Sequence, residues 1–209
     1  MKRPQAVEQL RALIGQDVHM LARNYGISVV GASGKVNKGW AGHVFERHLG
    51  LPLNSAQAPN FGSWELKVVP LKRTGLGILQ VKETMAVTMI DEWQVGRTPF
   101  EESHLLTKLQ RAVIVARIVG EDVHSPSTVH SVNLLDLKGS MYEQIKDDYE
   151  LVRTCINDPK RGFGALTGKM GVYIQPRTKG AGHGSTSRAF YARTSFLEKL
   201  FGFDSRKAR

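Results

Sequence analysis

The chain has 209 residues, of which 41% are hydrophobic, and this size and composition suit one globular domain. The sequence has no apolar run long enough for a membrane span, no secretory apolar core near Met1 and only one cysteine, Cys155, which excludes an internal disulfide. Of the net charge of +10, residues 153–209 contribute +9, which suggests either a polyanionic partner or a solubilising surface.

Apolar spacing predicts helices and strands in alternation along the chain. Helical periodicity covers residues 5–25, 39–49, 100–110, 140–156 and 195–201. Alternating or continuous apolar residues predict strands at 64–71, at 77–90 (one long strand or a pair), and at 112–119, 129–137 and 171–175. A flexible basic stretch is expected at 177–187, before the ordered pair Phe190 and Tyr191, one of which should lie in the core. Helices that flank a mixed sheet indicate an α/β fold.

The strongest chemical motif lies in the predicted strand at 64–71. Because side chains alternate along a strand, Glu65 and Lys67 point the same way, while Leu66 and Val68 point into the core. A carboxylate beside an ammonium group suits phosphodiester hydrolysis: the carboxylate can hold a divalent cation, and the lysine can orient the attacking water. The alternative interpretation is an ion pair on an exposed strand, which Glu-x-Lys alone would favour.

Five blocks in chain order resemble the PD-(D/E)xK nucleases, and within them the MutH mismatch-repair nickases and the MvaI/BcnI restriction endonucleases. The blocks are residues 38–50, 60–67, 102–109, 175–179 and 190–191. The resemblance implies a restriction-endonuclease-like fold with a central mixed β-sheet flanked by helices. It also implies an enzyme that uses Mg²⁺, which Mn²⁺ or Ca²⁺ can replace for binding, and that leaves 5′-phosphates.

The resemblance assigns four residues to the catalytic site: Glu46, Asn60, Glu65 and Lys67. Asn60 and Glu65 would hold the metal, Lys67 would assist the attacking water, and Glu46 would support the site, although Glu46 could instead be a solvated helix residue.

Asn60 departs from the family pattern, because it stands where the family has its first metal-binding Asp, and no Asp lies between Asp17 and Asp91. An amide oxygen can coordinate a hard cation but brings no charge. Three interpretations remain: an Asp→Asn variant inactivated on purpose, a natural protein that is a poor or inactive nuclease, or a site for which Glu46 and Glu65 suffice.

Four further residues are expected to bind DNA. Lys108 falls where the MutH pattern has an important lysine, but a solvent-facing charge is the alternative. Arg177 and Lys179 resemble the family's DNA-contact loop, and Tyr191 resembles its late aromatic residue. The alternative without a function is a mobile basic loop.

The resulting hypothesis is a single nuclease domain, 1–209, with a catalytic half at about 1–120 and a basic DNA-contacting half at about 121–209. Its expected function is that of a type II restriction endonuclease acting on double-stranded DNA, without a membrane and in the prokaryotic cytoplasm near the nucleoid. The alternatives are a MutH-type nickase at hemimethylated sites, with a MutL-type partner, and a catalytically silent DNA-binding module. The sequence leaves open the recognition site, the methylation preference, the oligomeric state and whether one or both strands are cut.

Overall fold

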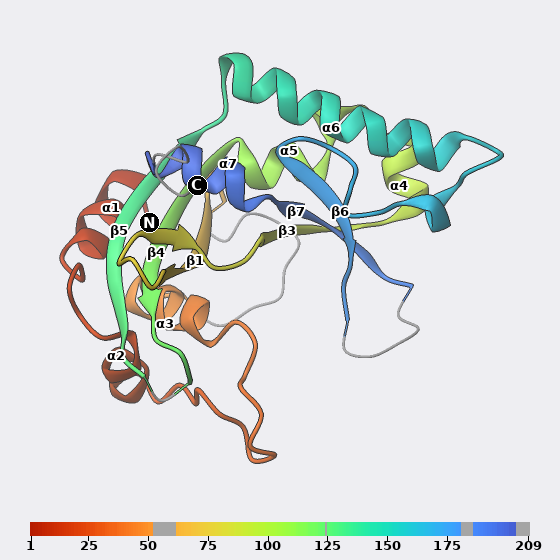
Figure 1. The fold of residues 1–209 in the computed structure, drawn as a ribbon. Coiled ribbons are helices and arrows are strands. Elements are labelled where there is room, and N and C mark those ends of the chain that lie inside the picture. Colours follow the sequence, from red (N-terminus) through yellow and green to blue (C-terminus); the bar gives the residue numbers. More distant parts are fainter. Residues whose placement is uncertain (52–61, 124, 181–185, 204–209) are drawn as a thin grey trace. The chain divides into compact units, whose positions relative to one another are not determined.

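The computed structural model describes residues 1–51, 62–123, 125–180 and 186–203 (Figure 1). The chain forms two compact units. The first unit contains residues 1–83 and 112–135, and the second contains residues 84–111 and the chain from 136 onward. Each unit is therefore discontinuous in sequence. None of the helices in the described ranges is long and apolar enough to cross a membrane.

A four-stranded mixed sheet forms the centre of the first unit (Figure 1). In spatial order its strands are β2 (Leu79–Val81), β1 (Glu65–Arg73), β4 (Arg111–Val119) and β5 (Ser127–Asp136). β1 runs antiparallel to β2 and parallel to β4, with Glu65 opposite Ala112. The predicted α/β class with a mixed sheet flanked by helices is confirmed.

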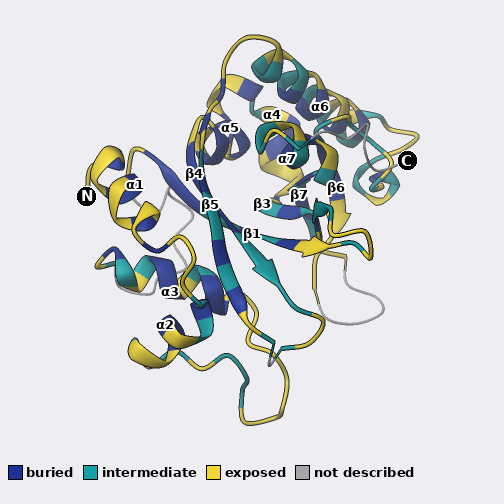
Figure 2. Ribbon diagram, turned by 60° about the vertical axis from the view of Figure 1, so that its left-hand side comes forward, coloured by how far each residue is buried: buried dark blue, intermediate teal, exposed yellow. Residues whose placement is uncertain are grey.

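β4 is the most buried strand of this sheet, as its apolar sequence predicts. Residues 112–116 are all buried, and Figure 2 shows this part of β4 in dark blue. The exception is Arg117, whose Nη1 donates to the Ser127 hydroxyl at 2.6 Å and whose guanidinium lies 5.0 Å from the centre of the Trp40 ring. Burial lowers the pKa of Arg117 to about 10, so the side chain stays charged at neutral pH.

Three helices cover one face of the first unit's sheet: α1 (Arg3–Arg11), α2 (Val18–Asn24) and α3 (Trp40–His48). Their buried side chains form one core cluster with Leu66 of β1 and with Val113 and Val115 of β4. The prediction of a single helix over 5–25 is wrong. Gly15 has a φ of 87°, and the Asp17 side chain accepts the His19 amide, so one helix ends and a second begins there.

The second unit holds a three-stranded antiparallel sheet that the sequence did not predict as separate. Its strand order is β3 (Met85–Ile90), β7 (Arg188–Ala192) and β6 (Ile174–Thr178). Its helical segments are α4 (Glu92–Arg97), η1 (Phe100–Glu102), α5 (His104–Leu109), α6 (Gly139–Asn157), η2 (Phe163–Ala165) and α7 (Thr194–Leu200). The strand region expected at 77–90 therefore consists of two strands, β2 and β3, which belong to different sheets.

Three elements of the second unit differ from the sequence prediction. The helix expected at 100–110 is divided into η1 and α5, because the Ser103 side chain caps a new helix by accepting the Leu106 amide. Helix α4 was not predicted. The strand expected at 171–175 begins at Ile174 and runs to Thr178, because the backbone before it turns through Gly171, which has a φ of 75°.

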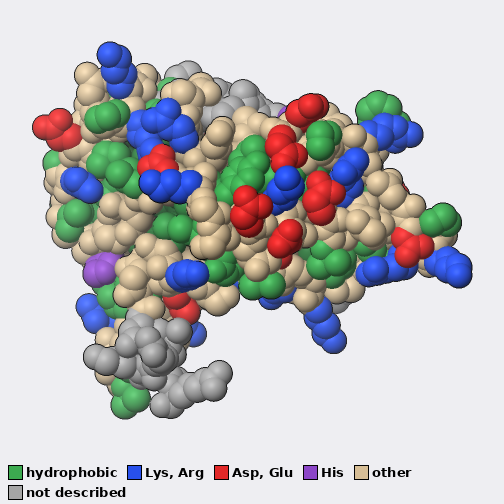
Figure 3. Space-filling model, turned by 90° about the horizontal axis from the view of Figure 1, so that it is seen from above, with side chains coloured by type: hydrophobic (Ala, Val, Ile, Leu, Met, Phe, Trp, Pro, Cys, Tyr) green, Lys and Arg blue, Asp and Glu red, His purple; other side chains and the backbone are tan. Residues whose placement is uncertain are grey.

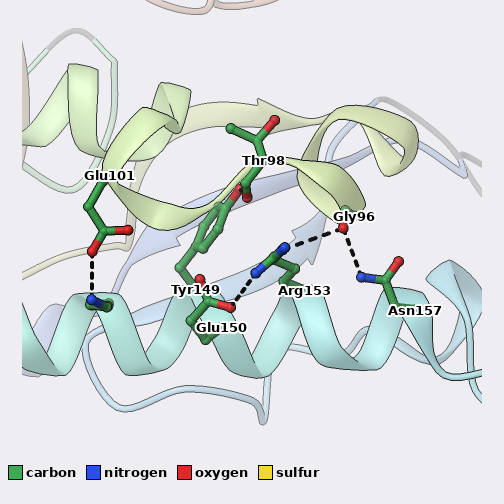
Figure 4. A network of polar contacts seen from close by, with 8 residues as sticks. Gly96, Thr98, Glu101, Tyr149, Glu150, Arg153 and Asn157 are labelled. Carbon is green, nitrogen blue, oxygen red and sulfur yellow. Dashed lines mark hydrogen bonds and ion pairs between the residues drawn. The ribbon is translucent and has the colours of Figure 1, made fainter.

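Helix α6 holds the C-terminal end of α4 and the residue after it, Thr98, through a row of polar contacts (Figure 4). The Tyr149 hydroxyl donates to the Thr98 carbonyl at 2.9 Å, and the Asn157 amide donates to the Gly96 carbonyl at 2.8 Å. The same Gly96 carbonyl accepts a longer bond from Arg153 Nε at 3.4 Å. These bonds satisfy carbonyls that α4 and the segment after it leave unpaired.

The buried Asp148 carboxylate on α6 fixes the start of β6. It accepts three consecutive backbone amides, from Val172, Tyr173 and Ile174, each at 2.7 Å. A Cβ at Gly171 would lie 1.9 Å from the Ile174 carbonyl oxygen, so the turn that leads into this arrangement requires glycine.

Candidate functional site

Glu65 and Lys67 lie together at the beginning of β1. The Lys67 Nζ is 2.9 Å from Glu65 Oε1, and the side chains of Lys67 and Glu65 are 18% and 2% exposed, respectively. Leu66, between them, points to the opposite face and packs in the core cluster. The pair is therefore on one face of an interior strand, as the period of two requires.

The burial of Glu65 separates this pair from an ordinary surface ion pair. Moving a carboxylate out of water costs several kcal/mol, on the order of what a close cation can restore, so such pairs add little net stability. The strand also gives the two groups a fixed position, because Glu65 and Lys67 lie in the part of β1 that pairs with the buried strand β4. The arrangement suits a preorganised anionic oxygen with a cationic hydrogen-bond donor beside it.

Glu46 lies on α3, the helix that packs against β1, and is partly exposed. Asn60 lies outside the described residues. Within the described ranges, no three His, Cys, Asp or Glu side chains lie close enough together to hold a metal ion. A magnesium site here would therefore have one or two carboxylates from the chain and take its other oxygens from Asn60, water and the phosphate, which is the donor set that Mg²⁺ commonly uses.

Lys108 occupies a different environment from the one that a surface charge would have. It lies on α5 in the second unit and is only 7% exposed. The alternative of a solvent-facing lysine is wrong, because this residue shares the buried side of a short helix with Leu105 and Leu109. Arg111, three residues further along the chain, is the exposed first residue of β4.

Arg177 and Tyr191, two of the predicted DNA-binding residues, meet on the β6–β7 hairpin. The Arg177 guanidinium lies 5.7 Å from the centre of the Tyr191 ring, and its Nη1 donates to the Thr84 hydroxyl at 3.0 Å. Arg177 is exposed but belongs to a strand, so the expectation of a loop at this residue is wrong. Phe190, the neighbour of Tyr191, is the core member of the pair, as predicted.

Lys179 follows β6 directly and is exposed. Its backbone amide donates to the Ser187 carbonyl at 2.9 Å, which continues the hairpin beyond the paired strands. Residues 181–185, the remainder of the predicted basic loop, lie outside the described residues. The hairpin thus presents Arg177 and Lys179 two residues apart, on a backbone that pairing with β7 fixes.

Sequence reasoning missed three residues that position these side chains. Thr84 anchors Arg177 across 93 residues of sequence, and Asp148 fixes the start of β6. Arg193 donates to the carbonyls of Gly168, Met170 and Gly171 and so fixes the turn before β6. The one signal in the sequence was the position of Asp148 in its helix. At helical spacing it shares the buried side of α6 with Ile145 and Val152, where an apolar residue would be expected.

Comparison with protein families gives a match to the DNA mismatch repair enzyme MutH over residues 49–148. Among curated relatives, the type II restriction enzyme Sau3AI of Staphylococcus aureus is 27% identical over 203 residues, which are 92% of this chain and 41% of that protein. The mismatch repair protein MutH of Vibrio campbellii is 26% identical over 211 residues, covering 93% of this chain and 90% of that protein. The chain thus spans less than half the length of the Sau3AI enzyme.

Among solved structures, a complex of the restriction endonuclease MvaI with its cognate DNA aligns with 96% of this chain and 97% of the MvaI chain. The TM-score is 0.40 and the sequence identity is 12%, so this likeness is distant.

Proposed function

We propose that this chain is an endonuclease that acts on specific sequences in double-stranded DNA, because residues 49–148 match the MutH family and nearly the whole chain is similar to Sau3AI and to MutH. The proposed biological role is that of a type II restriction enzyme in the prokaryotic cytoplasm, near the nucleoid, with products that carry 5′-phosphates. Sau3AI, which aligns with nearly all of this chain, is a type II restriction enzyme. The basic C-terminal quarter of the chain supports a polyanionic substrate.

The proposed site contains Glu65, Lys67, Glu46 and Asn60. A bound divalent cation, Mg²⁺ in this proposal, would polarise the scissile phosphate and lower the pKa of the attacking water. Glu65 and Asn60 would hold that cation through their oxygen atoms, and Glu46 would support the site from α3. Lys67 Nζ would orient the attacking water and stabilise the negative charge that develops on the phosphate.

The observation that carries this proposal is the burial of Glu65 against Lys67 on an interior strand. A fold that needed only stability at this place would be served as well by two apolar residues, since a buried ion pair adds little net stability. Buried, paired ionisable groups are instead typical of catalytic sites.

The test is cleavage of supercoiled plasmid by the Asn60→Asp protein with magnesium. The expected result is nicked and then linear plasmid, with the unsubstituted chain slower because its amide brings no charge to the metal. Sequencing the ends formed on genomic DNA then gives the recognition site and the cut position. If Asn60→Asp neither nicks nor cuts, the assignment of residue 60 as a metal ligand is wrong.

A second candidate is a mismatch-repair nickase acting at hemimethylated sites. It is favoured by the family match and by the Vibrio protein, whose length this chain covers almost completely. A nickase of this kind should be stimulated by a MutL-type activator and should leave one strand intact, whereas a restriction enzyme should cut both strands alone. Plasmid cleavage with and without such an activator separates the two.

A candidate from another class is a DNA-binding module without catalysis, which Asn60 favours. Filter binding of the unsubstituted chain with and without magnesium, beside the cleavage assay, distinguishes it from an enzyme. Tight binding of a varied genomic substrate that Asn60→Asp never cleaves would favour the module.

A further inference from the structure

Residues 158–171, which make up most of the segment between α6 and β6, are held in place by buried or partly buried polar groups. We call residues 158–171 the arm. Arg193 donates to three of its carbonyls: to Gly168 at 2.8 Å, to Met170 at 3.0 Å and to Gly171 at 3.1 Å. Asp148 accepts the three amides that directly follow the arm. Six hydrogen bonds therefore fix the backbone conformation at the end of the arm.

The middle of the arm is fixed as well. Leu166 is 2% exposed, so the arm inserts an apolar side chain into the core. Arg188 of β7 donates to the Gly164 carbonyl at 3.4 Å, and its guanidinium lies 6.0 Å from the centre of the Phe163 ring. The arm is therefore docked on the second unit at several positions along its length.

Three cations of this docked segment point into solvent. Lys160, Arg161 and Lys169 are all exposed, and none of them has a hydrogen bond or ion pair through its side chain among the described residues. The one carboxylate of the arm, Asp158, accepts the Lys160 backbone amide at 2.9 Å. A docked segment that presents three cations and one carboxylate has a net positive charge and is suited to a polyanion.

The charged side chains on and around α6 provide a contrast within the same unit. Lys146 pairs with Glu101 and Arg153 with Glu150, while Glu143 and Asp147 are not buried. On the α6 side of the molecule, Figure 3 shows acidic side chains lying among the basic ones. The named side chains there are two cations and four carboxylates, so carboxylates are in excess around α6, whereas cations are in excess on the arm.

The arm also adjoins the hairpin that carries Arg177. A Cβ on Gly168 would lie 3.4 Å from Arg177 Cγ and 3.3 Å from Gln175 Oε1, so the arm's backbone packs directly on these β6 side chains. Lys169 is the next residue. Lys169 and the Arg177–Tyr191 pair are therefore neighbours on the surface of the second unit.

We propose that the arm is a phosphate-binding element of the DNA interface, in which Lys160, Arg161 and Lys169 bind the nucleic-acid backbone, with Lys169 beside Arg177. This inference rests on the proposed function. In it, the arm supplies sequence-independent affinity and orientation, because phosphate contacts position a protein on DNA. Arg193 is a positioning residue for Lys169, because it donates to the carbonyls of Gly168 and Met170 on either side of it.

The test measures how the affinity for a mixed-sequence DNA duplex depends on salt, by fluorescence anisotropy in the absence of divalent metal. The variant Lys160→Gln/Arg161→Gln/Lys169→Gln is compared with the unsubstituted chain. Each cation that neutralises a phosphate adds about 0.9 to the slope of log K against log salt, so removing these three should reduce the slope by about 2 to 3. The variant Lys160→Arg/Lys169→Arg should keep the original slope.

The matched control removes the same charge from exposed cations of the first unit, as Arg11→Gln/Arg23→Gln/Lys72→Gln. An unchanged slope in the arm variant would overturn the proposal, and so would an equal reduction in the control, because the effect would then come from net charge alone. Circular dichroism checks that the variants are folded. If the unsubstituted chain shows no salt-dependent DNA binding, the proposed function itself fails, and the arm proposal falls with it.

Discussion

Glu65 is a carboxylate buried at the first position of an interior strand, and Lys67 is the cation 2.9 Å away that compensates it. Removing the cation leaves a buried charge with one partner fewer, which is a costly state. Lys67→Ala is therefore expected to lower the free energy of unfolding by about 1–3 kcal/mol in urea denaturation at neutral pH.

The control for this prediction is Lys72→Ala, on the same strand but exposed. It should change the unfolding free energy by less than about 0.5 kcal/mol. Equal stability of the Lys67→Ala variant and the unsubstituted chain would mean that Glu65 is compensated by other groups and that the pair is not a unit.

Tyr149 provides a pH-dependent test of burial in the second unit. Burial raises the pKa of its phenol to about 12, from an ordinary value of 10. Between these values the unfolded chain has lost the proton while the folded chain keeps it, so stability should fall as pH rises from about 10 to about 12. Below pH 10 both states are protonated and Tyr149 adds no pH dependence.

The measurement is the difference in urea midpoint between the unsubstituted chain and Tyr149→Phe across pH 9–12. Taking the difference removes the opposing contribution of Arg117, whose lowered pKa favours the folded state as pH rises. The midpoint of Tyr149→Phe should fall less steeply above pH 10. Parallel curves for the two proteins would show that the phenol is not desolvated.

Strand β6 depends on a single carboxylate of helix α6. Asp148 accepts three backbone amides, and an Asn in its place offers one uncharged acceptor and must direct an NH₂ group at amides that are themselves donors. Asp148→Asn is expected to cost about 2–4 kcal/mol of unfolding free energy, given that bonds to charged groups contribute about 1.5–3 kcal/mol each.

Hydrogen exchange gives the local readout of this prediction. The amides of Val172, Tyr173 and Ile174 should exchange faster in Asp148→Asn, while those of β4 change only in proportion to global stability. Asp147→Asn, the neighbour on the same helix that is not buried, is the matched control and should leave both measurements unchanged. Similar effects from both substitutions would argue for helix α6 as a whole and against the Asp148 contacts.

The elements show where sequence reasoning succeeds and where it stops. The strands β1, β4 and β5 and the helices α3, α6 and α7 were predicted within a few residues, because periodic burial is written directly into their sequences. The break between α1 and α2 depends on one glycine with positive φ, and the end of the turn before β6 depends on Asp148, which is distant in sequence. Neither feature changes the spacing of apolar residues, so a periodic pattern does not reveal it.

The same limit applies to the candidate site. The placement of Glu65 and Lys67 on one strand face follows from a period of two, and the resemblance supplied the choice of these residues. The burial of Lys108 and the anchoring of Arg177 by Thr84 arise from tertiary packing, so no short window of sequence contains them. Catalytic roles for Glu46, Asn60, Glu65 and Lys67 stay predictions.

The molecule as a whole is made of two discontinuous units, and this has a consequence for truncation. The sheet of the first unit needs β4 and β5, which come from residues beyond 110. A fragment of residues 1–110 keeps β1 without its parallel partner, and its core cluster lacks Val113, Val115, Val129 and Val132. We expect this fragment to be unfolded.

Circular dichroism and urea titration test this expectation. The fragment should show no cooperative transition, whereas the full chain should unfold in one or two cooperative steps. A cooperatively folded fragment would mean that the first unit is stable without its central strand. The functional division into a catalytic and a DNA-contacting half remains a prediction that DNA-binding variants have to test.

The central claim is that the Glu65–Lys67 pair is where phosphodiester hydrolysis takes place. The most direct measurement is the single-turnover cleavage rate of plasmid with magnesium for Asn60→Asp alone and in combination with Lys67→Ala, Glu65→Gln or Lys72→Ala. The account predicts a loss of about 100-fold or more for the combinations at residues 65 and 67 and an unchanged rate for the Lys72 control. Cleavage that persists at the Asn60→Asp rate without Lys67 or Glu65, in folded protein, would contradict it.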